Sequence, residues 1–191
     1  ATAEARDAAI EANRQSPDLI PAAVIAARAM IEKGDKRGAT RILKKAWEAQ
    51  PHPDLAASFA AIEPDEVPEA RLKRFRTLLS VNPGHEESRL TEAELLLAAE
   101  DFPAARAALG SLPQTHPPQR ALTILAAAER GSGAPDDQVR ATLSRALTAP
   151  RPLDGREGMA DWDRPLLRFK VFAFFPLLGP PLGALTFFAL V

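Results

Sequence analysis

The sequence predicts an all-α protein, an α-solenoid in which helix pairs stack in a line. Prolines recur about every 33 residues, and such a period is typical of helical repeats. Hydrophobic residues make up 46% of the chain, and the commonest of them is alanine, the strongest helix former. No segment alternates β-branched and polar residues as a half-buried strand would. The periodic prolines are Pro17, Pro51, Pro83, Pro117 and Pro150.

Residues 2–17 predict the second helix of a truncated first repeat. Ala5, Ala9 and Ala12 recur three or four positions apart, so they share one helical face, and Pro17 follows them. The array, over residues 1–150, is therefore expected to begin with a helix whose own partner is missing.

Residues 18–51 predict the first complete pair. Small residues such as Ala27 lie midway along the first helix, Gly34 marks the turn, and Leu43 lies on the apolar face of the second helix. Pro51 ends the unit, because proline lacks an amide donor and disfavours helix in the residue before it.

Residues 52–83 depart from this pattern. The expected first helix, "PDLAASFAAIE", is interrupted by "PDEVP", and Arg71 stands where the other units carry a small residue. The sequence therefore predicts a degenerate repeat with a shortened first helix. The pattern returns at 84–117, where Ala105 and Leu109 lie in the second helix, and again at 118–150.

The composition changes after residue 150. Residues 151–165 are polar and rich in Pro and Gly, which is typical of a linker. Residues 166–191 form an apolar tail with no charge after Lys170, long enough to cross a bilayer as a helix. Three interpretations stay open: a membrane segment with its preceding side in the cytoplasm, a tail that is docked on the solenoid as a cap or disordered, or a gene-model artefact such as a fusion or frameshift.

The composition also excludes several functional classes. The formal net charge of −1 argues against a general nucleic-acid binder. The chain has no Cys, so disulfides, zinc–thiolate sites and cysteine nucleophiles are excluded. No glycine-rich phosphate loop or Ser/His/Asp signature is present, and we expect neither an enzyme nor a cofactor.

The segments "ATRIL" and "ARAAL", the small residues midway along the first helices and the terminal prolines resemble the tetratricopeptide repeat (TPR). This resemblance implies a right-handed superhelix whose concave face is lined by the first helix of each pair. That face would bind an extended peptide or an amphipathic helix of a protein partner. In this register, the candidate docking residues are Val24, Arg28, Ile31, Leu90, Glu94, Leu97 and Ile124.

The phrase "WEAQPHPDLA" is similar to the TPR region of HemY, a family of bacterial inner-membrane proteins associated with haem biosynthesis, in its alphaproteobacterial form. The resemblance implies a membrane anchor ahead of Ala1 and a repeat domain on the cytoplasmic side. It also implies a scaffold role beside late haem-pathway enzymes. The HemY relatives often end in a Cys-rich tail, which this chain lacks.

Histidines accompany the inter-repeat prolines at His52, His85 and His116. As polar turn residues they need no ligand, but a haem or tetrapyrrole carrier that uses them is an alternative function. A purely structural spacer within a membrane assembly is another. The basic segments 36–45 and 71–76 predict solvated second-helix faces, or a patch that faces acidic lipid or an acidic partner.

Overall fold

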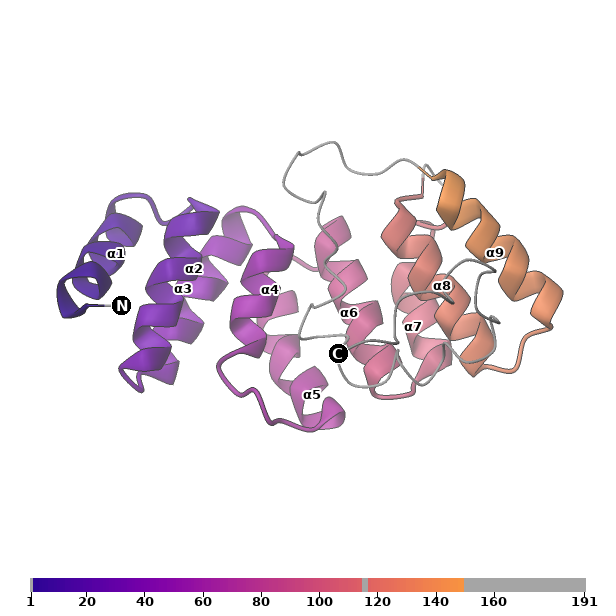
Figure 1. Cartoon of the computed structure of the whole chain (residues 1–191), viewed down its shortest axis with the longest axis horizontal. Helices are drawn as coiled ribbons and strands as arrows, with labels where there is room; N and C mark the ends of the chain where they lie inside the picture. The colour runs from indigo at the N-terminus through magenta and orange to yellow at the C-terminus, as the bar shows by residue number, and fades with distance from the viewer. Residues whose placement is uncertain (1, 115–116, 150–191) are drawn as a thin grey trace, which may run out of the picture.

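The computed structural model describes residues 2–114 and 117–149, and every regular element in these ranges is an α-helix (Figure 1). The all-α prediction is therefore confirmed for the described part of the chain. Its helices are α1 (Ala3–Gln15), α2 (Ile20–Glu32), α3 (Lys36–Ala49), α4 (Pro53–Ala60), α5 (Pro68–Leu79), α6 (Glu86–Ala98), α7 (Phe102–Leu109), α8 (Gln119–Gly131) and α9 (Asp136–Thr148).

The helices form an elongated stack of the TPR-like solenoid type (Figure 1). Helices α2, α4, α6 and α8 contact one another in succession and form what we call the first-helix layer. Helix α2 packs on α3, α6 on α7, and α8 on α9, while α1 packs against α2. Because no single pair can bury its apolar face alone, each pair is stabilised by its neighbours in the line.

The prolines that set the sequence period lie between the helix pairs. Pro17 follows α1, Pro51 follows α3, Pro83 follows α5 and Pro117 follows α7, while Pro150 lies outside the described residues. Each of these four described prolines lies in the loop before a helix of the first-helix layer. Because proline neither donates a ladder hydrogen bond nor lets the preceding residue stay helical, it ends one unit before the next begins.

The turns inside three pairs share one backbone geometry at equivalent positions. Gly34, Glu100 and Gly133 have positive φ angles of 79°, 60° and 75°. In each turn the next amide donates to the carbonyl five residues back, as Asp35 N does to Met30 O at 2.9 Å. This arrangement satisfies carbonyls that the end of a helix leaves without partners.

The second helices of two pairs begin on matching acidic caps. The Asp35 carboxylate accepts from Gly38 N at 2.7 Å, and the Asp101 carboxylate accepts from Ala104 N at 3.2 Å. A cap of this kind stabilises a helix by about 1 kcal/mol. The turn and cap therefore recur with the repeat, and they fix the direction in which each second helix leaves its turn.

Small side chains let the helices of the N-terminal core pack closely. Ala23, Ala27 and Ala39 are fully buried between α2 and α3, beside the fully buried Trp47. The indole N–H of Trp47 donates to Ser88 Oγ at 3.1 Å, a contact from α3 to α6 across the degenerate unit. A buried indole N–H needs such a partner, because leaving it unpaired would cost about 1–3 kcal/mol.

Arginines organise the degenerate unit, in which α4 has 8 residues. Arg71 is buried, and its guanidinium donates to Pro64 O at 2.8 Å, which holds the long loop between α4 and α5. Burial lowers the pKa of Arg71. Arg74 donates to Phe59 O at 2.7 Å and lies over the rings of Phe59 and Phe75. The bulky Arg71 therefore replaces a small-residue helix contact with a polar tie to a loop.

The predicted linker 151–165 and apolar tail 166–191 lie outside the described residues. Within the ranges that the structure describes, none of the helices is both long enough and apolar enough to span a bilayer.

Candidate functional site

Three of the seven predicted docking residues lie on α2 and reach its surface. Arg28 is exposed, and no described residue pairs with its guanidinium. Val24 and Ile31 are half-buried, because their inner sides pack on the N-terminal core. Ile25, three positions before Arg28, is 57% exposed. These four side chains make a continuous surface that we call the α2 edge.

The α2 edge places three partly exposed apolar side chains beside the guanidinium of Arg28, which has no ion-pair partner among the described residues. The backbone of α2 satisfies its own hydrogen bonds, so a partner can be held only through side chains. Apolar anchors at helical spacing suit an amphipathic helix or an extended segment, and Arg28 suits a carboxylate on it. The edge can therefore bind a protein segment, while none of its four residues supplies a nucleophile or a general base.

The prediction for α6 requires correction, because Leu90 and Glu94 are only 4% and 2% exposed. Leu90 packs against Leu109 of α7 and Ala121 of α8 rather than facing solvent. Leu97 is half-buried and packs against the same core. Neither Leu90 nor Glu94 therefore belongs to a free surface of the described chain.

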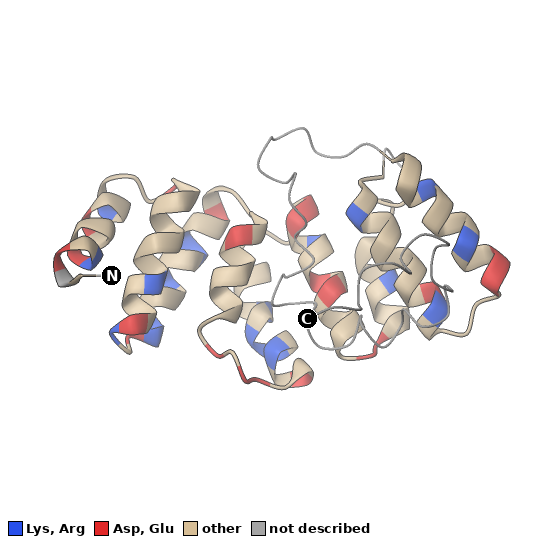
Figure 2. Cartoon of the chain, in the orientation of Figure 1, with Lys and Arg blue, Asp and Glu red and all other residues tan. Residues whose placement is uncertain are grey.

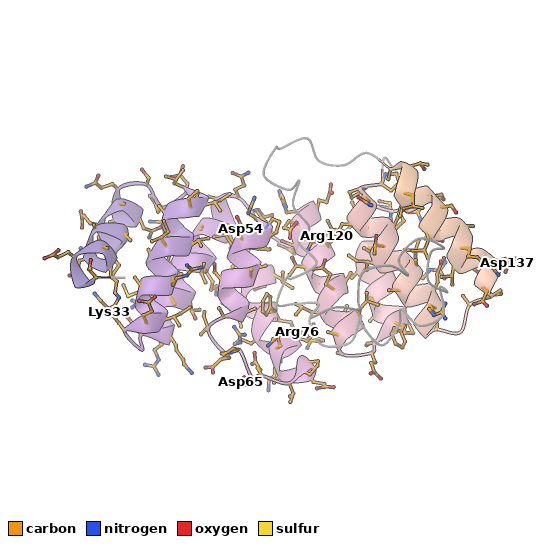
Figure 3. All side chains as sticks on the ribbon, in the orientation of Figure 1. Lys33, Asp54, Asp65, Arg76, Arg120 and Asp137 are labelled. Atoms are coloured by element: carbon orange, nitrogen blue, oxygen red, sulfur yellow. The ribbon has the colours of Figure 1, made fainter. Side chains whose placement is uncertain are left out.

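The physical reason for the burial of Glu94 is an ion cluster that ties α6 to α8 through Arg120, the residue labelled in Figure 3. Arg120 Nε donates to Glu94 Oε1 at 2.6 Å, and Arg120 Nη1 donates to Glu87 Oε2 at 2.7 Å. Thr91 Oγ1 donates to Glu87 Oε1 at 3.1 Å. Burial lowers the pKa of Arg120, but the Glu94 and Glu87 carboxylates raise this pKa by more, so the guanidinium stays charged. The cluster therefore links α6 to α8 through buried charges.

The predicted residue on α8 also proves to be buried, since Ile124 is 4% exposed and packs in the core with Leu125. The neighbouring residue Thr123 is exposed. Thr123, rather than Ile124, continues the 33-residue register of Val24. The prediction therefore missed the outer face of α8 by one position, and a one-residue step turns a helical side chain by about 100°.

The two described histidines of the carrier hypothesis are helix caps. His52 Nδ1 accepts from Asp54 N at 3.2 Å, and His85 Nδ1 accepts from Glu87 N at 3.1 Å. One ring nitrogen of each imidazole therefore caps the N-terminus of a helix: His52 caps α4 and His85 caps α6. His116 lies outside the described residues.

The sign of the surface charge differs between α4 and α6 of the first-helix layer and the second helices α3 and α5. Figure 2 shows acidic segments on α4 and α6, and basic segments on α3 and α5. Asp54 and Glu86, in the first turns of α4 and α6, are exposed. Acids at these positions complement the positive end of the helix dipole. On α4 and α6, the exposed charged side chains are therefore carboxylates rather than cations.

A shallow hollow of about 370 Å³ lies beside α7. Among its lining residues Arg106 is the charged group, and Gly110 and Leu125 contribute to its wall. General acid–base catalysis needs a positioned proton donor or acceptor near neutral pKa, and the residues of this hollow supply none. The hollow is therefore a weaker candidate site than the α2 edge.

Two functional features escaped the sequence analysis. The first is the exposure of Ile25. The repeat register alone does not predict that Ile25 is exposed while its neighbour Ala26 is buried. The cluster of Arg120 with Glu87 and Glu94 was also missed, although the seven-residue spacing of the two carboxylates places them on one helical face. The seven-residue spacing of Glu87 and Glu94 was the sequence signal that could have predicted this cluster.

Residues 65–128 match the family model described as tetratricopeptide repeat. The chain carries a TPR region. The match spans α5, α6, α7 and most of α8, so it includes the ion cluster and leaves the α2 edge outside. No curated protein and no solved structure matches this chain. TPR regions typically bind protein partners, which agrees with a scaffold role.

Proposed function

We propose that this protein is a non-enzymatic scaffold that binds a protein partner through the α2 edge. One observation carries the proposal: Ile25 is 57% exposed on a helix that buries the next two residues, Ala26 and Ala27, completely. Full burial of a wholly exposed side chain of that size contributes about 1.5–3 kcal/mol, so a partner that covers the exposed part of Ile25 gains roughly half of that. Arg28, unpaired among the described residues, adds a charged contact that orients the partner.

We further propose that the scaffold works on the cytoplasmic side of a bacterial inner membrane, beside enzymes of haem biosynthesis. The resemblance of "WEAQPHPDLA" to the HemY family supports this placement. The docked partner would then be a segment of an inner-membrane or haem-pathway protein, with a carboxylate near its apolar anchors.

Site-specific photocrosslinking in cells tests this proposal. A photoreactive residue at position 25 is expected to capture a defined protein, whereas the same residue at position 140 on α9 captures none of it. Arg28→Glu should abolish the capture, because it places a carboxylate opposite the partner's carboxylate. Arg140→Glu, an equal change of an exposed arginine, should leave it intact.

The identity of the captured protein tests the finer proposal. A haem-pathway or inner-membrane protein supports it, and a protein of another kind contradicts it. Equal capture from positions 25 and 140, or no capture from either, would instead favour the structural spacer. Haem titration distinguishes the carrier, since a Soret shift lost in His52→Ala and His85→Ala would contradict docking as the main role.

A further inference from the structure

The second helices α3 and α5 contact each other and carry a concentration of cations at the surface. On α3, Arg37, Arg41, Lys44 and Lys45 recur four, three and one positions apart, so they share one face opposite the fully buried Leu43. Lys44 is half-buried and the other three are exposed. From Arg37 to Lys45 this face extends about 12 Å along the helix axis.

The matching outer positions of α5 include Lys73 and Arg76, and both are exposed; Figure 3 labels Arg76 on this helix. We call the outer cations of the two helices the basic stripe: Arg37, Arg41, Lys44, Lys45, Lys73 and Arg76.

The cations of the basic stripe are free of intramolecular partners within the described ranges. Lys36, at the start of α3, pairs with Glu63 at 2.7 Å, and Arg74 pairs with Glu66 at 2.8 Å, but neither cation belongs to the stripe. No described residue forms an ion pair or a side-chain hydrogen bond with the stripe itself. The carboxylates on the same faces are Glu48 on α3 and Glu69 on α5.

We propose that the basic stripe binds the surface of an anionic phospholipid bilayer. A lipid surface attracts Lys and Arg through charge and needs no complementary shape; each such cation strengthens binding about fivefold. The long flexible side chains can reach phosphates at different depths. Six cations against two carboxylates therefore give the stripe an excess that suits a negatively charged plane.

The composition of the stripe favours lipid over an acidic protein. Protein interfaces are organised around a desolvated centre with aromatic or apolar anchors, and lysine is depleted there. The exposed residues of α3 include no large apolar side chain, and those of α5 include none either. Single-stranded nucleic acid would call for aromatic stacking platforms, which this surface also lacks.

The stripe lies on α3 and α5, away from the α2 edge, so this inference stands apart from the proposed docking function. It adds an orientation: with α3 and α5 against the bilayer, the first-helix layer would be directed away from the lipid. A partner could then approach the α2 edge from the aqueous side.

Vesicle co-sedimentation of the full 191-residue chain tests the inference. Vesicles of phosphatidylcholine mixed with phosphatidylglycerol are compared with vesicles of phosphatidylcholine alone, which reveal binding that does not depend on charge. The triple variant R37Q/R41Q/K45Q is expected to lower the partition coefficient on anionic vesicles by about 100-fold, at roughly fivefold per cation. Added salt should weaken binding of the unaltered chain, because it screens exposed charges.

A matched control removes three exposed arginines from other helices, R14Q/R106Q/R140Q, with the same change in net charge. It should retain partitioning far better than the stripe variant, and circular dichroism should show equal helicity in both. Equal losses in the two triples would overturn the inference, as would charge-independent binding to both kinds of vesicle. Preferential binding of polyglutamate or single-stranded RNA, in competition with the anionic vesicles, would overturn it as well. In any of these cases crosslinking from position 25 would be unchanged.

Discussion

Arg120 on α8 binds Glu94 on α6 with two parallel hydrogen bonds, Nε to Oε1 at 2.6 Å and Nη2 to Oε2 at 2.7 Å. The Glu94 carboxylate is 2% exposed, so it has left water almost completely. The two parallel hydrogen bonds compensate both charges for the loss of water. Either group without the other would be an uncompensated buried charge. The two first helices are therefore locked in one register.

Glu94→Gln should destabilise the fold by about 3 kcal/mol, because it leaves Arg120 with Glu87 alone. Urea denaturation followed by circular dichroism measures the change. Glu92→Gln, on the same helix but half-buried and without a described partner, should stay within about 0.5 kcal/mol. Equal midpoints for the two variants would show that the ion cluster contributes nothing to the stack.

Gly131→Ala should destabilise the protein although alanine is the better helix former. A Cβ at Gly131, the last residue of α8, would overlap the ring of Phe102 at the start of α7. The overlap should cost about 1–3 kcal/mol, more than the roughly 1 kcal/mol that helix propensity returns. Gly84→Ala is the control, since nothing lies within 4 Å of its Cβ position. A thermal melt with Gly131→Ala at or above wild type contradicts this packing.

Phe75→Ala should cost about 3–5 kcal/mol of unfolding free energy. The Phe75 ring is fully buried and meets the Phe59 ring edge to face at 4.9 Å between centroids. This contact joins α5 to the short α4. Val67→Ala, at a side chain 61% exposed, should change the unfolding free energy by less than about 0.5 kcal/mol. A small cost for Phe75→Ala would mean that the degenerate unit is loosely packed.

The pKa of Asp7 should lie below its ordinary value of 3.8, because Lys33 Nζ donates to its carboxylate at 2.6 Å. Since the folded-state pKa is lowered, the stabilisation is complete above the unfolded pKa and is lost as the pH falls through the folded pKa. Carbon-detected NMR titration of the Asp7 carboxyl group measures this pKa. Lys33→Met should raise it toward 3.8; an unchanged midpoint would show that the Asp7–Lys33 contact does not persist in solution.

The sequence determined the elements and their order. The proline spacing, Gly34 in a turn and the apolar face at Leu43 depend on local backbone chemistry and helical periodicity, which neighbouring residues decide. The helix pairs and a TPR region therefore followed from the chain alone. The HemY assignment, the membrane setting and docking at the α2 edge stay predictions.

Only the tertiary structure decided which outward positions remain free. Glu94 and Arg28 occupy equivalent repeat positions, yet Glu94 is buried because Arg120 reaches it from α8, while Arg28 has no such partner among the described residues. Periodicity describes one repeat, whereas burial depends on the side chains that the next repeat brings. For the same reason the sequence showed only that Arg71 departs from the repeat pattern. The tertiary structure shows that its guanidinium donates a hydrogen bond to Pro64 O in the loop between α4 and α5.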